Sequence, residues 1–221
     1  MKRISPSEKQ PRKRAVLEKD KLSKKSNIIL AAANLLLKRD LNDLSMDDVA
    51  KKAKVAKGTL YLYFPTKEDL VLRVHMSDYQ AWINALDVFL ESPSSFTHNF
   101  EDWFVNSFEN HTRFIKILPI VPTILEKHAS YETIKEFKSE LLSGLKKIEP
   151  ALTKKLGFQR KEDTFMFILQ CHAIAIGAWS HGFPSDTVKR VISDNGMELF
   201  QIDYVTFVKK AIVTLQRGFR D

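Results

Sequence analysis

The spacing of apolar residues limits what this chain can fold into. In the segment 26–39, apolar side chains recur every three or four residues, and the same spacing returns in most of the segments that follow. No segment shows the sustained alternation and hairpin signals of a β-strand. We therefore predict an all-α protein of about nine helices, at about residues 26–39, 45–53, 57–64, 66–91, 95–110, 112–127, 131–149, 161–181 and 199–218.

Composition excludes several classes of protein. The chain has 221 residues, 44% of them hydrophobic, which is enough for the core of one domain or two small ones. The single cysteine, Cys171, can form neither an internal disulfide nor a multi-cysteine zinc site, and no histidine and carboxylate triplet has metal-ligand spacing. We expect no metal and no cofactor. Because residues 1–25 lack a signal-like apolar run, we expect a cytoplasmic protein.

The uncharged run Thr164–Ser185 is long enough to span a membrane, but polar residues interrupt it. Gln170, His172, Ser180 and His181 lie within it, and Gly182 to Pro184 shorten its helix. We therefore expect a helix buried on several sides, and no membrane partner.

Charge is divided unevenly along the chain. Residues 1–73 contain 18 basic and 9 acidic residues, a balance of +9, whereas residues 74–221 contain 17 and 18, a balance of −1. This division predicts a small basic module, which would bind a polyanion, joined to a larger near-neutral one. Residues 1–25, with ten basic residues and two prolines, are predicted to be a basic flexible tail. The tail is either solvated or follows a DNA backbone.

Two short helices joined by a tight turn are predicted within the basic module. Ser45 is a good N-cap for the first helix, residues 54–57 are too short to be another element, and Pro65 ends the second. This is a helix-turn-helix pattern, whose second helix enters the major groove of DNA. Gly58 and Thr59 leave room for a close approach, and Lys57, Tyr61 and Tyr63 reach phosphates or base edges.

A family resemblance rests on three runs: Leu44 to Ala50 (LSMDDVA), Ala53 to Phe64 (AKVAKGTLYLYF) and Lys67 to Leu70 (KEDL). These runs resemble the N-terminal domain of TetR-type transcriptional regulators. The resemblance implies a DNA-binding domain over 26–73, a helical ligand-binding and dimerisation domain over 74–221, and a recognition helix beginning at Lys57. It implies that DNA contacts come from Ser45, Lys57, Gly58, Thr59, Tyr61, Tyr63 and Lys67. The alternatives are that the two tyrosines pack inside the domain and that Lys67 is only solvated.

The resemblance also implies that the last two long helices pair with those of a second chain to form a homodimer. Small residues in the first helix and an apolar stripe in the second suit close packing. The predicted interface residues are Ala173, Gly177, Ile202, Val205, Val208 and Ile212. A dimer places two recognition helices about 34 Å apart, which matches a palindromic operator. The alternative is that these helices are core helices of one chain.

Aromatic residues between these parts predict an apolar pocket for a small-molecule effector. Polar groups such as His172 would orient the effector inside it. The candidate lining residues are Trp103, Phe104, Phe108, Phe114, Leu118, Tyr131, Phe137 and His172. The alternative is that these side chains only fill the core.

These observations predict a homodimeric repressor that a small apolar or amphipathic ligand releases from its operator. The alternative within the same fold is control by a protein partner or by abundance, and a non-specific nucleic-acid packager is a third hypothesis. The Ser180 segment resembles a hydrolase nucleophile turn, but no strand precedes it and no histidine follows position 181. We therefore do not expect an enzyme.

Overall fold

The computed structural model describes residues 9–92, 99–194 and 196–220, and every regular element in these ranges is a helix. The predicted all-α class is confirmed for this part of the chain. The elements are α1 (Lys9–Leu36), α2 (Met46–Ala53), α3 (Lys57–Tyr63), α4 (Lys67–Glu91), α5 (Phe100–Asn110), α6 (Thr112–Ile117), the short helices η3 (Leu118–Ile120) and η4 (Val121–Leu125), α7 (Glu126–His128), α8 (Tyr131–Leu156), α9 (Lys161–Gly182), α10 (Asp186–Asp194), η5 (Glu198–Phe200) and α11 (Tyr204–Gly218).

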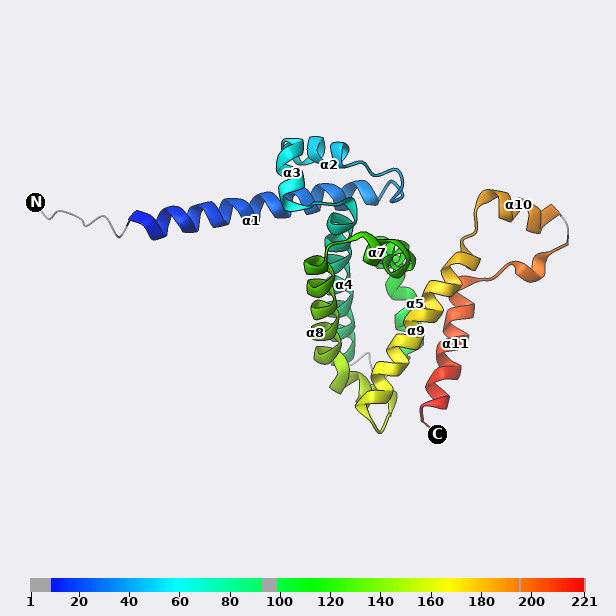
Figure 1. The fold of residues 1–221 in the computed structure, drawn as a ribbon. Coiled ribbons are helices and arrows are strands. Elements are labelled where there is room, and N and C mark those ends of the chain that lie inside the picture. Colours follow the sequence, from blue (N-terminus) through cyan, green and yellow to red (C-terminus); the bar gives the residue numbers. More distant parts are fainter. Residues whose placement is uncertain (1–8, 93–98, 195, 221) are drawn as a thin grey trace, which may run out of the picture.

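Helices α1, α2 and α3 form a small unit at one end of the molecule (Figure 1). The second half of α1 crosses beneath α2 and packs against the start of α4. Ile28, Val49, Leu60 and Leu70 are fully buried where these helices meet. Burial of the apolar face of each short helix stabilises this unit, because helices of seven or eight residues are marginal by themselves.

The prediction of a flexible tail over residues 1–25 is wrong for residues 9–25, which belong to α1; residues 1–8 lie outside the described part. Lys, Arg, Leu and Glu dominate this segment, and all have high helix propensity. Pro11 lies in the first turn, where its missing N–H has no helical partner to lose. The segment is also continuous with a packed half-helix, so elongation needs no new nucleation.

The larger part of the molecule is built around α4. Helix α8 runs beside α4, and α9 runs beside α11 on the other side of α5 (Figure 1). Between α9 and α11 the chain leaves this body as an excursion that contains α10 and η5 (Figure 1).

Several predicted boundaries are wrong. Helix α8 continues through Pro150 to Leu156, because Ile148, Leu152 and Leu156 form a buried stripe that holds both sides of the proline in the core. The helix expected over 112–127 is divided into α6, η3, η4 and α7 at Pro119 and Pro122. Helix α10 was not predicted, and α11 begins at Tyr204 rather than near 199.

Two cores meet along α4. The core of the small unit extends past residue 73, since Ile117, Val121, Leu125 and Phe137 from the larger part pack into it. The second core lies between α4, α5, α8, α9 and α11. The two parts of the protein are thus connected by packing as well as by the continuous helix α4.

Candidate DNA-binding surface and effector domain

Helix α2 begins and ends with well-formed caps. The Ser45 hydroxyl accepts a hydrogen bond from the Asp48 N–H at 3.1 Å, and Asp47 and Asp48 lie in the positive first turn. Lys54 ends the helix in the left-handed region, with φ of 56°, and its N–H bonds to carbonyls of the last turn. This left-handed residue turns the chain sharply, so α3 begins three residues later.

Helix α3 presents an exposed face to solvent. Lys57 and Gly58 are exposed, Tyr61 and Leu62 are 42% and 85% exposed, and Thr59 is half-buried. A Cβ added at Gly58 would meet no atom within 4 Å, so the glycine leaves its backbone open to something outside this chain. The exposed start of α3 has the shape needed for close approach to a groove of DNA.

The inner face of α3 is held by Leu60 and Phe64, which are 0% and 2% exposed. Tyr63 is half-buried against the same core, so only part of its ring is available to a partner. The structure brings Lys57, Gly58, Thr59 and Tyr61 to one surface, and it places Tyr63 beside that surface.

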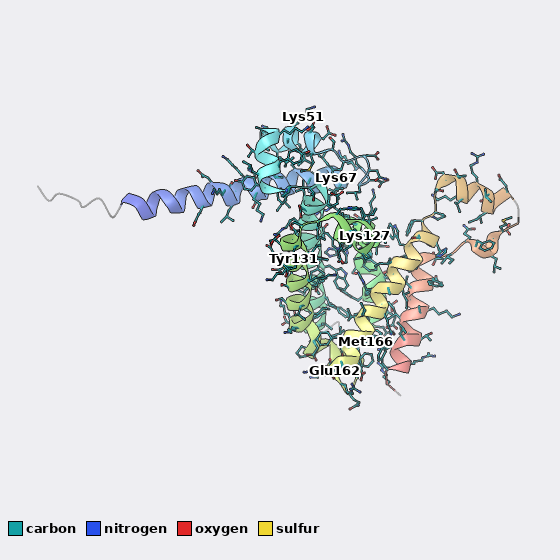
Figure 2. The ribbon with its side chains drawn as sticks, in the orientation of Figure 1. Lys51, Lys67, Lys127, Tyr131, Glu162 and Met166 are labelled. Carbon is teal, nitrogen blue, oxygen red and sulfur yellow. The ribbon has the colours of Figure 1, made fainter. Side chains whose placement is uncertain are left out.

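Lysines supply the positive charge near this face. Lys51, Lys52 and Lys54 of the α2 region are exposed, and Lys51 lies at the outer end of the molecule (Figure 2). The Lys57 ammonium forms an ion pair with Asp47 at 2.7 Å, and this hydrogen bond raises the pKa of Lys57. The pair is exposed on both sides, so it contributes little stability and can open when a phosphate replaces the carboxylate.

Lys67 does not point freely into solvent. Its ammonium donates to the carbonyl oxygen of Leu41 at 3.0 Å, in the loop between α1 and α2. That carbonyl also accepts from the Leu44 N–H at 3.3 Å, so the lysine adds a second hydrogen bond to an acceptor in the loop. The predicted phosphate contact is replaced in this conformation by a bond that ties α4 to the DNA-binding unit.

The start of α4 is also tied to the larger part. Thr66 and Asp69 form a capping box, and the second carboxylate oxygen of Asp69 accepts from both the N–H and the hydroxyl of Ser130, each at 2.8 Å. Burial opposes ionisation of Asp69, but the hydrogen bonds from Ser130 and Thr66 outweigh it and lower the pKa. A charged Asp69 therefore joins the first turns of α4 and α8.

A second link was missed by sequence reasoning. Arg113 of α6 makes two hydrogen bonds to the Asp78 carboxylate of α4, at 2.8 and 2.5 Å, and a third to the Ala33 carbonyl of α1 at 3.1 Å. One side chain thus joins the DNA-binding unit, α4 and the larger part. Asp78 and Ala33 lie 35 and 80 positions before Arg113 in the sequence, so no local sequence pattern indicates these contacts.

A small open cleft adjoins Arg113. It has a volume of about 160 Å³ and lies where the end of α1, the middle of α4 and the break between α5 and α6 meet. Its lining residues are Leu37, Asp78, Asn110, His111, Thr112, Arg113 and Phe114.

The aromatic residues predicted to line a pocket mostly pack on one another. Phe104, Phe108 and Phe114 are buried, with ring centroids 4.9 to 6.5 Å apart along the series, and the half-buried Trp103 stacks on Phe89. Leu118 is buried in the same core, whereas Phe137 belongs to the core beside the DNA-binding unit.

Tyr131 does not join this group. It is 71% exposed at the start of α8, so its prediction as a pocket residue is wrong (Figure 2). The first turn of α8 is anchored by Ser130 and Thr133, and this places the Tyr131 side chain on the outer face of the helix.

His75 is the buried polar group that sequence reasoning missed. It lies on α4, 1% exposed, stacked on Phe114 with centroids 5.1 Å apart and tilted against Phe137 at 5.9 Å. Its Nδ1 has no hydrogen-bond partner among the described residues. Burial, and secondarily the charge of nearby His172, lowers the pKa of His75 to about 3, so the ring is neutral. A histidine between the apolar residues Val74 and Met76 of the fourth predicted helix was the signal available in the sequence.

His172 of α9 is half-buried near His75, and burial lowers its pKa as well. Two imidazoles, on α4 and α9, thus lie near each other, with Phe114 and Phe137 packed against His75. Such a set can hydrogen-bond one polar group of an otherwise apolar molecule.

The predicted dimer residues fall into two groups. Ala173 and Gly177 are exposed on α9, on the same face as Met166 and Leu169, which are 48% and 59% exposed. Of the α11 set, Val205 is 43% exposed and Ile202 is half-buried just before the helix.

Val208 and Ile212 are 0% exposed inside the core of their own chain, so their prediction as dimer contacts is wrong. They pack with α9 and α5 residues of the same chain, which occupy the apolar side of α11.

No group of three metal-ligating side chains occurs within the described residues. Across the same ranges, no helix has both the length and the apolarity needed to cross a bilayer.

The fold and the exposed face of α3 define a class: an all-helical transcriptional regulator with an N-terminal helix-turn-helix. The family model of bacterial regulatory proteins of the tetR family matches residues 28–74, and that of the tetracyclin repressor-like C-terminal domain matches residues 76–221. The chain belongs to the TetR family of DNA-binding transcriptional regulators, which are not enzymes.

Two relatives agree with this assignment. An uncharacterized HTH-type transcriptional regulator of Haemophilus influenzae is 30% identical over 111 residues, which cover 50% of this chain and 56% of the relative. The HTH-type transcriptional regulator EthR of Mycobacterium tuberculosis is 49% identical over 45 residues, or 20% of this chain and 21% of EthR. The chain thus matches about half the length of the first relative and a fifth of the second.

Two solved structures share the fold. The fatty acid degradation regulator FadR from Bacillus halodurans aligns with a TM-score of 0.52 and 21% identity over 89% of this chain and 96% of that one. A TetR transcriptional regulator from Rhodococcus sp. RHA1 aligns with a TM-score of 0.51 and 19% identity over 87% and 94%.

Proposed function

We propose that this protein is a homodimeric repressor that binds a palindromic operator in the cytoplasm and is released by a small-molecule effector. The observation that carries the proposal is the arrangement along α4. One continuous helix begins beneath the exposed face of α3 and carries the buried, unpartnered His75 about 12 Å further on, since a helix rises about 1.5 Å per residue.

The exposed residues of α3 form the proposed reading head. Tyr61 and Thr59 contact base edges or thymine methyl groups, Lys57 exchanges Asp47 for a phosphate, and Gly58 allows the backbone to approach. Ser45 caps the start of α2 by accepting from the Asp48 N–H, and the positive end of this helix faces the backbone of DNA.

The effector site is proposed between α4, α6, α8 and α9. His75 and His172 supply polar contacts, and Phe114 and Phe137 supply apolar ones. A ligand that accepts or donates a hydrogen bond at Nδ1 of His75 satisfies a buried polar atom that otherwise costs about 1 to 3 kcal/mol. The effector shifts the protein only if it prefers the conformation that does not bind DNA.

Homodimerisation is proposed through the exposed α9 face that carries Met166, Leu169, Ala173 and Gly177. The small residues at its centre permit a close helix approach, and the larger ones fill the rim. A two-fold dimer supplies the second reading head that a palindromic operator requires.

Selection of bound sequences from random duplex DNA tests the reading head. The full-length protein should enrich one palindromic sequence and prefer it over random DNA by about 10³ or more. Tyr61→Ala should reduce this preference, whereas Tyr131→Ala, a matched change of an exposed tyrosine on α8, should leave it intact. Enrichment of no sequence, or equal preference in both variants, contradicts the proposal.

The effector arm of the proposal is tested by repeating the operator-binding assay across a metabolite panel. A true effector should weaken operator binding by the parent. The same compound should have much less effect on operator binding by His75→Leu. If every compound shown to bind the protein leaves operator affinity unchanged, ligand control is wrong and control by a protein partner or by abundance takes its place.

A further inference from the structure

The first half of α1 is a strongly basic helix that leaves the body of the protein. Residues 18–24 are all exposed, and the helix joins the packed core only from about Lys25, which is half-buried near Arg73. Figure 1 shows this half of α1 running outward on the side away from α9 and α11. We refer to residues 9–25 as the basic arm.

The charge of the N-terminal third resides mainly on this arm. Residues 9–25 contain eight basic and two acidic residues, a balance of +6, whereas residues 26–73 contain eight basic and six acidic residues, a balance of +2. The helix-turn-helix unit is therefore only weakly basic by itself. Most of the long-range attraction for a polyanion must come from the arm.

Within the arm, residues 18–24 make no contribution to the core that would explain their composition. Leu22, a large apolar residue within it, is 66% exposed, and the neighbouring residues are polar or charged. A helix segment whose side chains are all exposed gains little from packing, so Lys19, Lys21 and Lys24 are accessible to another partner.

We propose that the basic arm binds the phosphate backbone of DNA flanking each operator half-site. This inference rests on the proposed operator binding by α3. Because the arm leaves the body on the side opposite the proposed α9 dimer face, it points outward from the two-fold axis, along the DNA and beyond the half-site. Its 17 residues span about 25 Å, the length of about seven base pairs.

The rigid helix distinguishes this interaction from that of a disordered basic tail. A helix holds its lysines at fixed spacing along the duplex, and it loses less conformational entropy on binding than a free chain does. The contacts carry no base readout, so the arm adds affinity and salt dependence without changing which sequence α3 selects.

The test measures operator binding by the full-length protein at salt concentrations from about 50 to 200 mM. One DNA contains the selected operator alone, and a second adds about ten base pairs on each side. The arm variant is Lys19→Gln, Lys21→Gln, Lys24→Gln. The matched control is Lys135→Gln, Lys146→Gln, Lys154→Gln, which removes the same charge from exposed positions on α8. Circular dichroism confirms that each variant remains helical.

On flanked DNA we expect the arm variant to bind at least about tenfold more weakly than the parent near 0.15 M salt. The slope of log affinity against log salt concentration should fall by about 0.9 for each lost contact, or by up to about 5 for a dimer. On the operator alone, arm variant and parent should bind alike, and the control should match the parent on both DNAs.

Equal affinity and equal slope for parent and arm variant on flanked DNA would overturn the inference and leave operator binding by α3 intact. An equal loss on both DNAs overturns the flanking position. If no operator is selected, the proposed function fails, and the same titration on random duplex still tests the arm through its slope. An arm variant that binds DNA like the parent but loses binding to vesicles containing anionic lipid assigns the arm to a membrane surface instead.

Discussion

Replacing His75 with leucine should make the folding stability of this protein less sensitive to acid. In the folded state burial lowers the pKa of His75 to about 3, whereas an exposed histidine titrates near 6.5. As the pH falls below 6.5, the unfolded chain takes up a proton at this residue and the folded chain does not. Stability is therefore lost progressively from about pH 6.5 down to about pH 3.

The size of this effect follows from proton linkage. Between pH 7.5 and pH 5, a shift from 6.5 to about 3 costs about 2 kcal/mol of unfolding free energy. His75→Leu removes that contribution. At pH 7.5 the variant gains about 1 to 3 kcal/mol of stability because it no longer buries an unsatisfied Nδ1. It loses about 0.5 to 1.5 kcal/mol because the ring stacking on Phe114 is absent. These two effects oppose each other, so we expect little change or a small gain there.

Urea unfolding followed by circular dichroism at pH 7.5 and pH 5 measures both quantities. The parent should lose about 2 kcal/mol more than His75→Leu between these conditions. Other buried groups, including His172 and His111, whose pKa values burial also lowers, contribute equally to both proteins and cancel in the difference. His181→Leu makes the same substitution at an exposed histidine, and its stability should depend on pH as that of the parent does.

Equal acid sensitivity in the parent and His75→Leu would refute the reasoning. It would mean that the folded protein accommodates a proton at His75, either because water reaches the ring or because the surrounding helices open. The denaturant m-value distinguishes these cases, since opening of the helices exposes more surface and changes m.

Three further predictions concern stability, each measured by urea unfolding at pH 7.5. Arg113→Met should cost about 2 to 4 kcal/mol, because it leaves the buried Asp78 carboxylate without its partner. The double variant with Asp78→Leu should recover most of the loss, and no recovery would show that Arg113 acts through packing. Gly144→Ala should cost about 1 to 3 kcal/mol, because its Cβ would lie 2.6 Å from the Tyr79 hydroxyl, and Tyr79→Phe should relieve part of it. Thr66→Ala removes a capping box and should cost about 1 kcal/mol, whereas Thr66→Ser should cost much less.

Local signals predicted the helix-turn-helix in detail. Ser45 and Pro65 each favour a backbone conformation within a few residues of themselves, so the start of α2 and the end of α3 can be derived from the sequence. The left-handed conformation of Lys54 at the end of α2 has no such signal, because a lysine does not favour it. The same signals misled at Pro150, where buried residues four apart on either side of the proline keep the helix continuous. Tertiary packing therefore determines the length of α8 against the local preference of the proline.

Interactions between distant residues explain the rest of the differences. The stripe on α11 correctly identified its apolar side, but periodicity does not say whether the same chain or a second one covers that side, and here Val208 and Ile212 are covered by their own chain. The charge of residues 9–25 suggested disorder, yet charge does not oppose a helix when the helix continues into a packed segment.

Helix α4 receives contacts that alternate between the two parts of the protein. Lys67 bonds to the loop before α2, Asp69 to the start of α8, and Arg73 forms an ion pair with Glu136 of α8. Further along, Asp78 bonds to Arg113, which also holds α1 through Ala33. A displacement of α6 therefore cannot occur without moving α1, moving α4 or breaking these bonds.

Because α4 is long, a small tilt of this helix moves its far end by several ångströms. Its 25 residues span about 37 Å, so a tilt of about five degrees about one end moves the other end by about 3 Å. In a dimer that shift applies twice, once to each reading head, and about 6 Å is a large fraction of the width of a major groove of about 12 Å. If α4 transmits the effector signal, Asp78→Leu with Arg113→Met should fold and bind operator yet respond less to the effector, whereas the stability of the fold should change little. A full response in this double variant would place the coupling in the packed core of Ile117, Val121 and Leu125 instead.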